Sequence, residues 1–180
     1  MATRYLFLGF ILATLLGCEK EHEFEDNFLT CFYASYPGVK TKLDSIELFF
    51  VKYNILGDST AESYMRTLEA FCATDTIPFE MSEELVRDFR ALQLIPTSMN
   101  CLDKRLYKEK GFEHSKFYRL IMMFDRLEAS QLPPETYFRK ELPIIFTKED
   151  FEHRFYRYLG LMYGYGMIKS EINFHPERFR

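Results

Sequence analysis

Apolar residues recur at the spacing of an α-helix along most of this chain. In the first clear case Leu43, Ile46 and Phe50 stand at positions i, i+3 and i+7, so they share one face of a predicted helix that stops at Gly57. Four later segments repeat the pattern, with these inward-facing residues: Tyr64, Leu68 and Phe71; Leu85, Phe89 and Leu92; Phe117, Leu120, Ile121, Phe124 and Leu127; and Phe151, Phe155, Tyr158, Leu159 and Met162. Periodicity alone therefore predicts five helices.

Polar residues at the starts of these segments match helix caps. Ser59, with Glu62 three residues later, matches the S-x-x-E capping box. Ser82 precedes two glutamates, which suit the positive end of a helix dipole, and Thr147 with Asp150 offers a further cap. The caps agree with the periodicity and predict helix starts near these residues.

Prolines and glycines predict where the helices end. Pro133 and Pro134 break the segment before them, and the short apolar run 143–146, which contains a proline, can form an extended segment. Gly164 and Gly166 interrupt the last helical pattern. Strand signals are too thin elsewhere to predict a sheet.

Length and composition fit one helical domain. The chain of 180 residues holds 19 Phe, 12 Tyr and no Trp, and a domain of this size buries roughly two-thirds of the surface of its unfolded chain. Phe24, Phe28 and Phe32 also have helical spacing, so a short sixth helix can precede the other five. We predict an all-α fold, a compact irregular helical bundle of about five to six helices over residues 27–180. The aromatic residues are expected to fill its core.

The beginning of the chain has the layout of a secretory signal peptide. Arg4 precedes a run of twelve apolar residues, 5–16, and the small Gly17 stands directly before Cys18. A membrane-spanning helix needs about 20 apolar residues, so this run is too short to be one. Residues 1–17 are therefore predicted to be a cleaved signal peptide.

The sequence Leu15-Leu16-Gly17-Cys18 resembles the lipobox of bacterial lipoproteins. The resemblance implies cleavage before Cys18, acylation of its sulfur and of its new amino group, and hence an anchor of three acyl chains. Such an anchor holds a protein firmly, because each buried CH2 contributes about 0.8 kcal/mol. The expected location is the bacterial cell envelope, with the membrane bound through the lipid on Cys18.

Residues 18–26 are predicted to form a lipidated acidic tether. Residues 19–26 hold five acids and one lysine, and like charges keep such a segment extended. Acids directly after the lipidated cysteine resemble the surface-export signal of Bacteroidota lipoproteins. Glu19 rather than an aspartate follows Cys18, which favours the outer membrane over the inner one. The periplasmic and the surface side are both left open.

Three cysteines remain besides the predicted anchor: Cys31, Cys72 and Cys101. An odd number in an envelope protein allows one disulfide and one free thiol. We favour a disulfide between Cys72 and Cys101, because Cys72 ends a predicted helix and Cys101 lies in the loop-like stretch 97–111. This bond would stabilise the fold by about 3–4 kcal/mol. In the alternative, all three cysteines are buried thiols.

Charge and motifs exclude several classes of function. The net charge is −4, so the chain has no basic excess with which to bind nucleic acid. It contains none of the G-x-S-x-G, H-E-x-x-H, G-x-x-x-x-G-K-[ST] or G-x-G-x-x-G signatures. We therefore predict no catalytic residue, no metal ligands and no cofactor.

The first prediction for function is a non-enzymatic binding or structural module, anchored at Cys18, that presents one face to a protein partner in the envelope. Two alternatives stay open. The Phe- and Met-rich segments 120–127 and 151–167 can enclose an apolar cavity that carries a lipid or another small molecule. An enzyme can also assemble its site from residues distant in sequence. A fully packed core favours the module, a large apolar pocket the carrier, and a polar cleft with histidines and acids the enzyme.

Overall fold

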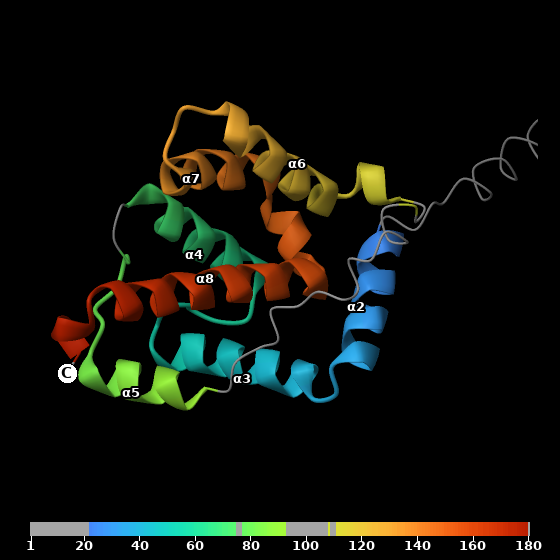
Figure 1. The fold of residues 1–180 in the computed structure, drawn as a ribbon. Coiled ribbons are helices and arrows are strands. Elements are labelled where there is room, and N and C mark those ends of the chain that lie inside the picture. Colours follow the sequence, from blue (N-terminus) through green and yellow to red (C-terminus); the bar gives the residue numbers. More distant parts are fainter. Residues whose placement is uncertain (1–21, 75–76, 93–107, 109–110, 180) are drawn as a thin grey trace, which may run out of the picture.

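The structure, a computed structural model, describes residues 22–74, 77–92, 108 and 111–179. In these residues it contains seven α-helices and no strand, so the all-α prediction is confirmed, with more helices than the five to six expected (Figure 1). The α-helices are α2 (Glu23–Ser35), α3 (Val39–Lys52), α4 (Ala61–Ala73), α5 (Glu83–Ala91), α6 (Lys116–Ala129), α7 (Pro134–Ile145) and α8 (Arg154–Phe174), and the 3-10 helices are η3 (Phe112–His114), η4 (Lys148–Glu152) and η5 (Pro176–Phe179).

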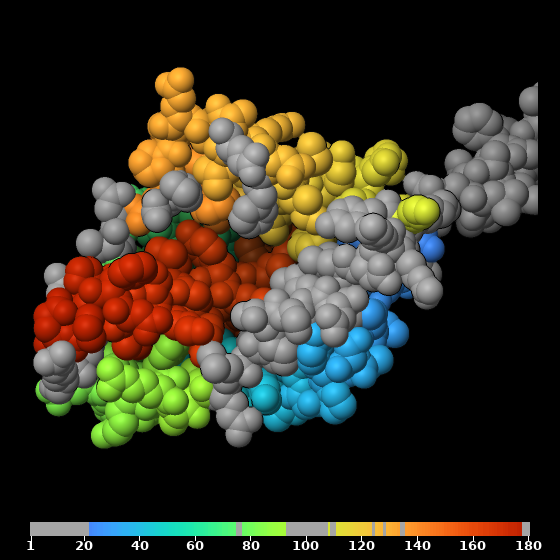
Figure 2. Space-filling model, in the orientation of Figure 1, coloured from blue at the N-terminus to red at the C-terminus, as the bar shows by residue number. Residues whose placement is uncertain are grey.

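The helix α8 lies at the centre of the arrangement. Helices α6 and α7 form a hairpin on one side of it, and α3 and α5 lie on the opposite side (Figure 1). Helix α4 packs against both α7 and α8, and α2 contacts α3 and α8. The space-filling view shows α8 as a red band between the yellow-to-orange α6–α7 hairpin and the green α5 (Figure 2). Each outer helix can therefore bury its apolar face against the centre.

Most of the predicted inward-facing residues form the core, and the others that the structure describes are partly buried against it: Leu92, Leu120, Ile121, Leu127, Leu159 and Met162. Leu43, Ile46 and Phe50 expose 1% or less of their surface. On α6, Phe117 is buried as predicted, and the side chain of Phe124 lies outside those that the structure describes. The helical periodicity therefore identified real buried faces.

Aromatic rings fill much of this core. The Phe24 and Phe117 ring centroids are 5.7 Å apart, and Phe155 meets Phe28 at 5.2 Å and Phe117 at 5.3 Å, both edge to face. The Phe24–Phe117 pair is stacked, and offset-stacked and edge-to-face pairs at these distances are the favoured geometries for aromatic rings. The cluster joins α2, α6 and α8 into one packed unit.

Two helix starts agree with the predicted caps and one is shifted. The Ser82 hydroxyl accepts a backbone N–H as predicted, and the backbone N–H of Thr147 donates to Asp150 Oδ2 at 2.6 Å. The cap at Thr147 begins the 3-10 helix η4. Helix α4 is capped by Thr60 rather than by Ser59, since the side chain of Thr60 accepts the N–H of Ser63 at 3.3 Å.

The sequence pattern does not predict helix α7, because its two prolines are typical of helix breaks. Pro134 occupies the first turn, where a missing N–H leaves no helical hydrogen bond unmade. Pro143 lies inside the helix near its end, where a proline costs about 3 kcal/mol. Burial of the neighbouring Leu142, Ile145 and Phe146 opposes that cost.

The predicted break at Gly164 and Gly166 is wrong, because α8 continues through both to Phe174. A Cβ placed on Gly164 would lie 2.6 Å from Cε2 of Phe50, whereas one on Gly166 would meet nothing within 4 Å. Gly164 therefore serves the close approach of α3 to α8, and does not end the helix.

The last residues of the predicted tether, 18–26, belong to a helix instead. Helix α2 begins at Glu23, and Phe24 and Glu25 are buried. Two contacts explain why these residues are ordered against the core. The ring of Phe24 stacks on Phe117, and the Tyr156 hydroxyl donates a hydrogen bond to the Glu25 carboxylate. None of the described helices is long and apolar enough to cross a membrane.

The predicted Cys72–Cys101 disulfide is contradicted, because Cys72 is a free thiol. It lies half-buried on α4 and hydrogen-bonds with Tyr163 on α8. The disulfide-bonded cysteine is Cys31 on α2. Cys101 and the predicted lipidation site Cys18 lie outside the described residues.

Candidate functional site

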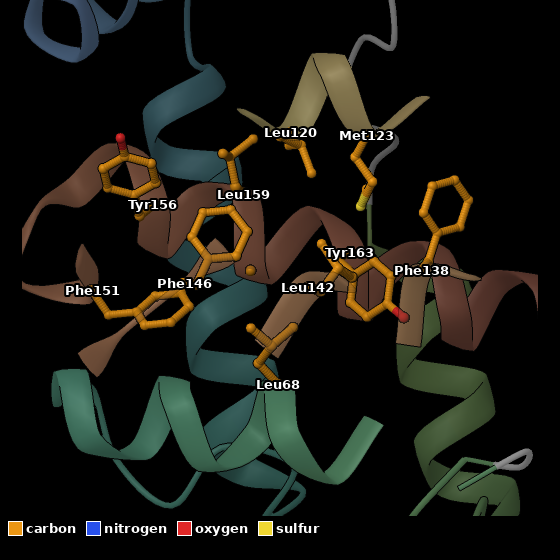
Figure 3. Close-up of a pocket in the computed structure, with 11 residues that line it drawn as sticks. Leu68, Leu120, Met123, Phe138, Leu142, Phe146, Phe151, Tyr156, Leu159 and Tyr163 are labelled. Atoms are coloured by element: carbon orange, nitrogen blue, oxygen red, sulfur yellow. The ribbon is translucent and has the colours of Figure 1, made fainter. Parts of the chain in front are cut away.

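An apolar cavity of about 180 Å³ lies between α4, α6, α7 and α8. Its walls are almost entirely hydrocarbon, and no acidic, basic or amide side chain lines it (Figure 3). The lining residues are Leu68, Leu120, Met123, Phe138, Leu142, Phe146, Phe151, Tyr156, Leu159, Gly160 and Tyr163. We call it the apolar cavity below.

One face of α8 forms the floor of the apolar cavity. Tyr156, Leu159, Gly160 and Tyr163 stand at positions i, i+3, i+4 and i+7, so their side chains point the same way. Gly160 contributes no side chain in the middle of this face. A flat floor between two tyrosine rings follows from this spacing.

The α6–α7 hairpin forms the roof. Leu120 and Met123 point from α6 toward Leu159 and Tyr163 of α8 (Figure 3). In this roof the side chains of Met123 and Leu142 are buried, and those of Leu120 and Phe138 are half-buried. The space lies between these side chains and the floor formed by α8.

The polar atoms near the apolar cavity stay uncharged at neutral pH. Burial, aided by a hydrogen bond to Glu25, raises the pKa of Tyr156 well above its usual value. Burial also raises the pKa of Tyr163 to about 12 and that of the neighbouring Cys72 thiol to about 11. The surroundings therefore suit an uncharged, apolar group.

A separate polar cluster lies behind Tyr156, where α2 meets the start of α8. Lys116 Nζ is 2.5 Å from Asp150 Oδ2, and His153 Nε2 is 3.2 Å from Asp26 Oδ1. The rings of His153 and His22 are stacked with centroids 4.5 Å apart.

Most of these polar groups are hydrogen-bonded to one another, whereas Nδ1 of His22 is buried without a hydrogen-bond partner among the described residues. Asp150 also accepts the backbone N–H of Thr147, and Glu25 accepts the Tyr156 hydroxyl. In the described part of the chain, no three histidine, cysteine, aspartate or glutamate side chains are grouped as metal ligands. The cluster fastens α2 to the rest of the fold, which favours a structural role over a catalytic one.

Comparison with protein-family models, with curated proteins and with solved structures finds no match for this chain. The function of this chain is therefore inferred from its own geometry.

The two segments that the sequence singled out for a cavity, 120–127 and 151–167, do come together around one. Sequence reasoning missed the contribution of α7, which supplies Phe138 and Leu142. Their i, i+4 spacing was a usable signal, but the flanking prolines outweighed it. Of the predicted site residues, only Cys72 is described, and it lies beside the cavity through its contact with Tyr163.

Proposed function

We propose that this protein is a lipid-anchored envelope protein that binds a small apolar molecule in the apolar cavity. The observation that carries the proposal is the cavity itself, about 180 Å³ with hydrocarbon walls. A dry cavity of about 150 Å³ lined by Leu, Ile and Phe side chains suffices to bind benzene. The ligand, or the part of it that enters, is therefore about the size of a single aromatic ring or a short alkyl chain.

The energetic cost of the cavity supports this proposal. A fully enclosed apolar void lowers stability by about 24 cal/mol per Å³, so for a volume of about 180 Å³ roughly 4 kcal/mol is an upper bound. The apolar cavity is partly open to the surface, so its cost is below that bound. A bound apolar ligand would make the packing contacts that the cavity walls lack and would recover part of this stability.

The anchor at Cys18 is the second part of the proposal, and the lipobox-like Leu15-Leu16-Gly17-Cys18 supports it. The chain from Cys18 to the start of α2 at Glu23 can span at most about 18 Å. An anchored domain would thus stay near the bilayer surface, where apolar molecules concentrate. The outer membrane is the proposed location.

Ligand binding can be tested on the chain from residue 19 onward, which contains the whole packed core. We expect toluene to raise the melting temperature, because a ligand at 100 times its Kd stabilises the folded state by about 2.7 kcal/mol. Leu120→Trp, which fills the apolar cavity, should remove the effect.

Leu132→Trp is the matched control, because Leu132 is a partly exposed residue between α6 and α7 that does not line the apolar cavity. It should respond to toluene as the wild-type protein does. An equal response of both tryptophan variants, or none in the wild type, would rule out the apolar cavity as the binding site.

A further inference from the structure

A groove of about 310 Å³ runs along the outer side of α6 and α7. Its apolar part includes Met122, Met123 and Ile145, and Ile144 at its edge exposes 74% of its surface. We call it the α6–α7 groove. Unlike the apolar cavity, it also has charged residues.

Met123 lines both the apolar cavity and the α6–α7 groove. It is buried, with 3% of its surface exposed, so its side chain stands between the two spaces. Methionine is unbranched, with three rotatable bonds, and adapts to irregular surroundings. A change of rotamer at Met123 can therefore join the cavity to the groove.

The charge of the α6–α7 groove favours an anion. Arg119 and Arg126 line it, and they lie seven residues apart, on the same face of α6. Both are exposed, and neither forms an ion pair with any residue that the structure describes. Glu141 of α7 is the one acid among the groove residues, so two cationic groups face a single anionic one.

We infer that the apolar cavity and the α6–α7 groove form one site for a single-chain carboxylic acid, whose hydrocarbon chain passes Met123 and whose carboxylate meets Arg119 and Arg126. The inference rests on the proposed function and names its ligand class. A guanidinium binds a carboxylate through two parallel hydrogen bonds. The volume of the cavity, about 180 Å³, suits one short chain rather than the two chains of a phospholipid.

Isothermal titration with octanoate and 1-octanol tests this inference, because the two ligands share a chain and differ in charge. At pH 7.5 the chain from residue 19 onward should bind octanoate about twofold to fivefold more tightly than octanol, as expected for exposed ion pairs. Arg119→Gln and Arg126→Gln should each reduce the preference, and Glu141→Gln should increase it. Arg90→Gln, an exposed arginine on α5, is the control that leaves it unchanged.

The outcomes separate this inference from the proposed function. If octanol binds as tightly as octanoate, the carboxylate has no site and the inference fails, while binding in the cavity stands. Equal loss of both ligands in the arginine variants would also overturn it, because the arginines would then act on the fold rather than on charge. If neither ligand nor toluene binds, both proposals fail.

Discussion

Among single residues, Cys72 has the best-defined chemistry. It is a free, half-buried thiol, and burial raises its pKa from 9.0 to about 11. Since the thiolate is the reactive form, such a thiol is protected from alkylation and oxidation at neutral pH. This is the opposite of what a catalytic or redox-active cysteine requires.

Alkylation of Cys72 in the native protein should therefore be slow and should rise with pH. Two units of pKa lower the thiolate fraction about a hundredfold, and the greater nucleophilicity of a more basic thiolate reduces the net effect to about tenfold relative to an ordinary thiol. Iodoacetamide labelling followed by mass spectrometry, from pH 7 to 10, measures this rate. Labelling as fast as that of free cysteine at pH 7.5 would contradict the burial of the thiol.

The anchor makes a second prediction at this scale. Cys18→Ala should abolish lipidation and the cleavage before residue 18, because the thiol of Cys18 is the proposed acceptor. Metabolic labelling with an alkyne fatty acid measures it in cells. Cys72→Ala serves as control and should keep the label; equal labelling of the Cys18 and Cys72 variants would disprove the anchor.

At the scale of elements, periodicity predicted five of the seven described α-helices with their buried faces and suggested a sixth, α2. The prediction failed where a proline or glycine in the local sequence indicates a helix end but packing against distant segments maintains the helix. The prolines of α7 predict a break, but burial of Leu142 and Ile145 maintains the helix. Gly164 predicts another break, yet its lack of a side chain is what lets Phe50 approach α8. Such contacts between distant segments leave no mark in a local window of sequence.

The two glycines of α8 give opposite predictions for the same substitution. Gly164→Ala should lower the free energy of unfolding by about 1–3 kcal/mol, because the new methyl group overlaps Phe50. Gly166→Ala should raise it by about 0.5–1 kcal/mol, because alanine is the better helix former and nothing lies within 4 Å. Urea denaturation of both variants measures the difference; similar values for the two would argue against the close approach of α3 and α8.

The candidate site was predictable only in part. Of the α8 residues that line the apolar cavity, helical spacing predicted only Leu159 as inward-facing, because α8 is buried on more than one side and a single periodic face does not describe it. The sequence also does not predict the space above this face, since the space depends on how far the α6–α7 hairpin lies from α8. Side chains that leave a void and side chains that fill one have the same pattern in sequence.

At the scale of the whole molecule, the polar cluster at the start of α8 holds α2 in place. The Tyr156 hydroxyl donates to Glu25, a carboxylate with 2% of its surface exposed. A buried acceptor that loses a donor costs about 1–3 kcal/mol. The Tyr156 hydroxyl thus adds to the aromatic contacts of Phe24 and Phe28 that attach α2 to the rest of the fold.

Tyr156→Phe should therefore lower the free energy of unfolding by about 1–3 kcal/mol, yet preserve toluene binding, because the ring that lines the apolar cavity remains. Chemical denaturation and calorimetry measure the two effects. Tyr165→Phe is the control, since the described residues form no hydrogen bond with the Tyr165 hydroxyl. A stability unchanged from the wild type would mean that Glu25 does not rely on Tyr156.

Because α2 begins at Glu23, an anchored domain would need only a low affinity for its apolar ligand. With Cys18 in the bilayer, as proposed above, the few residues before Glu23 confine the domain to a thin layer of solvent. Apolar molecules partition into the adjacent bilayer, so an anchored domain would meet them at a higher local concentration than in bulk solvent. A site that holds only a small hydrocarbon group, and binds it weakly in free solution, would then be filled for much of the time by molecules at the adjacent surface.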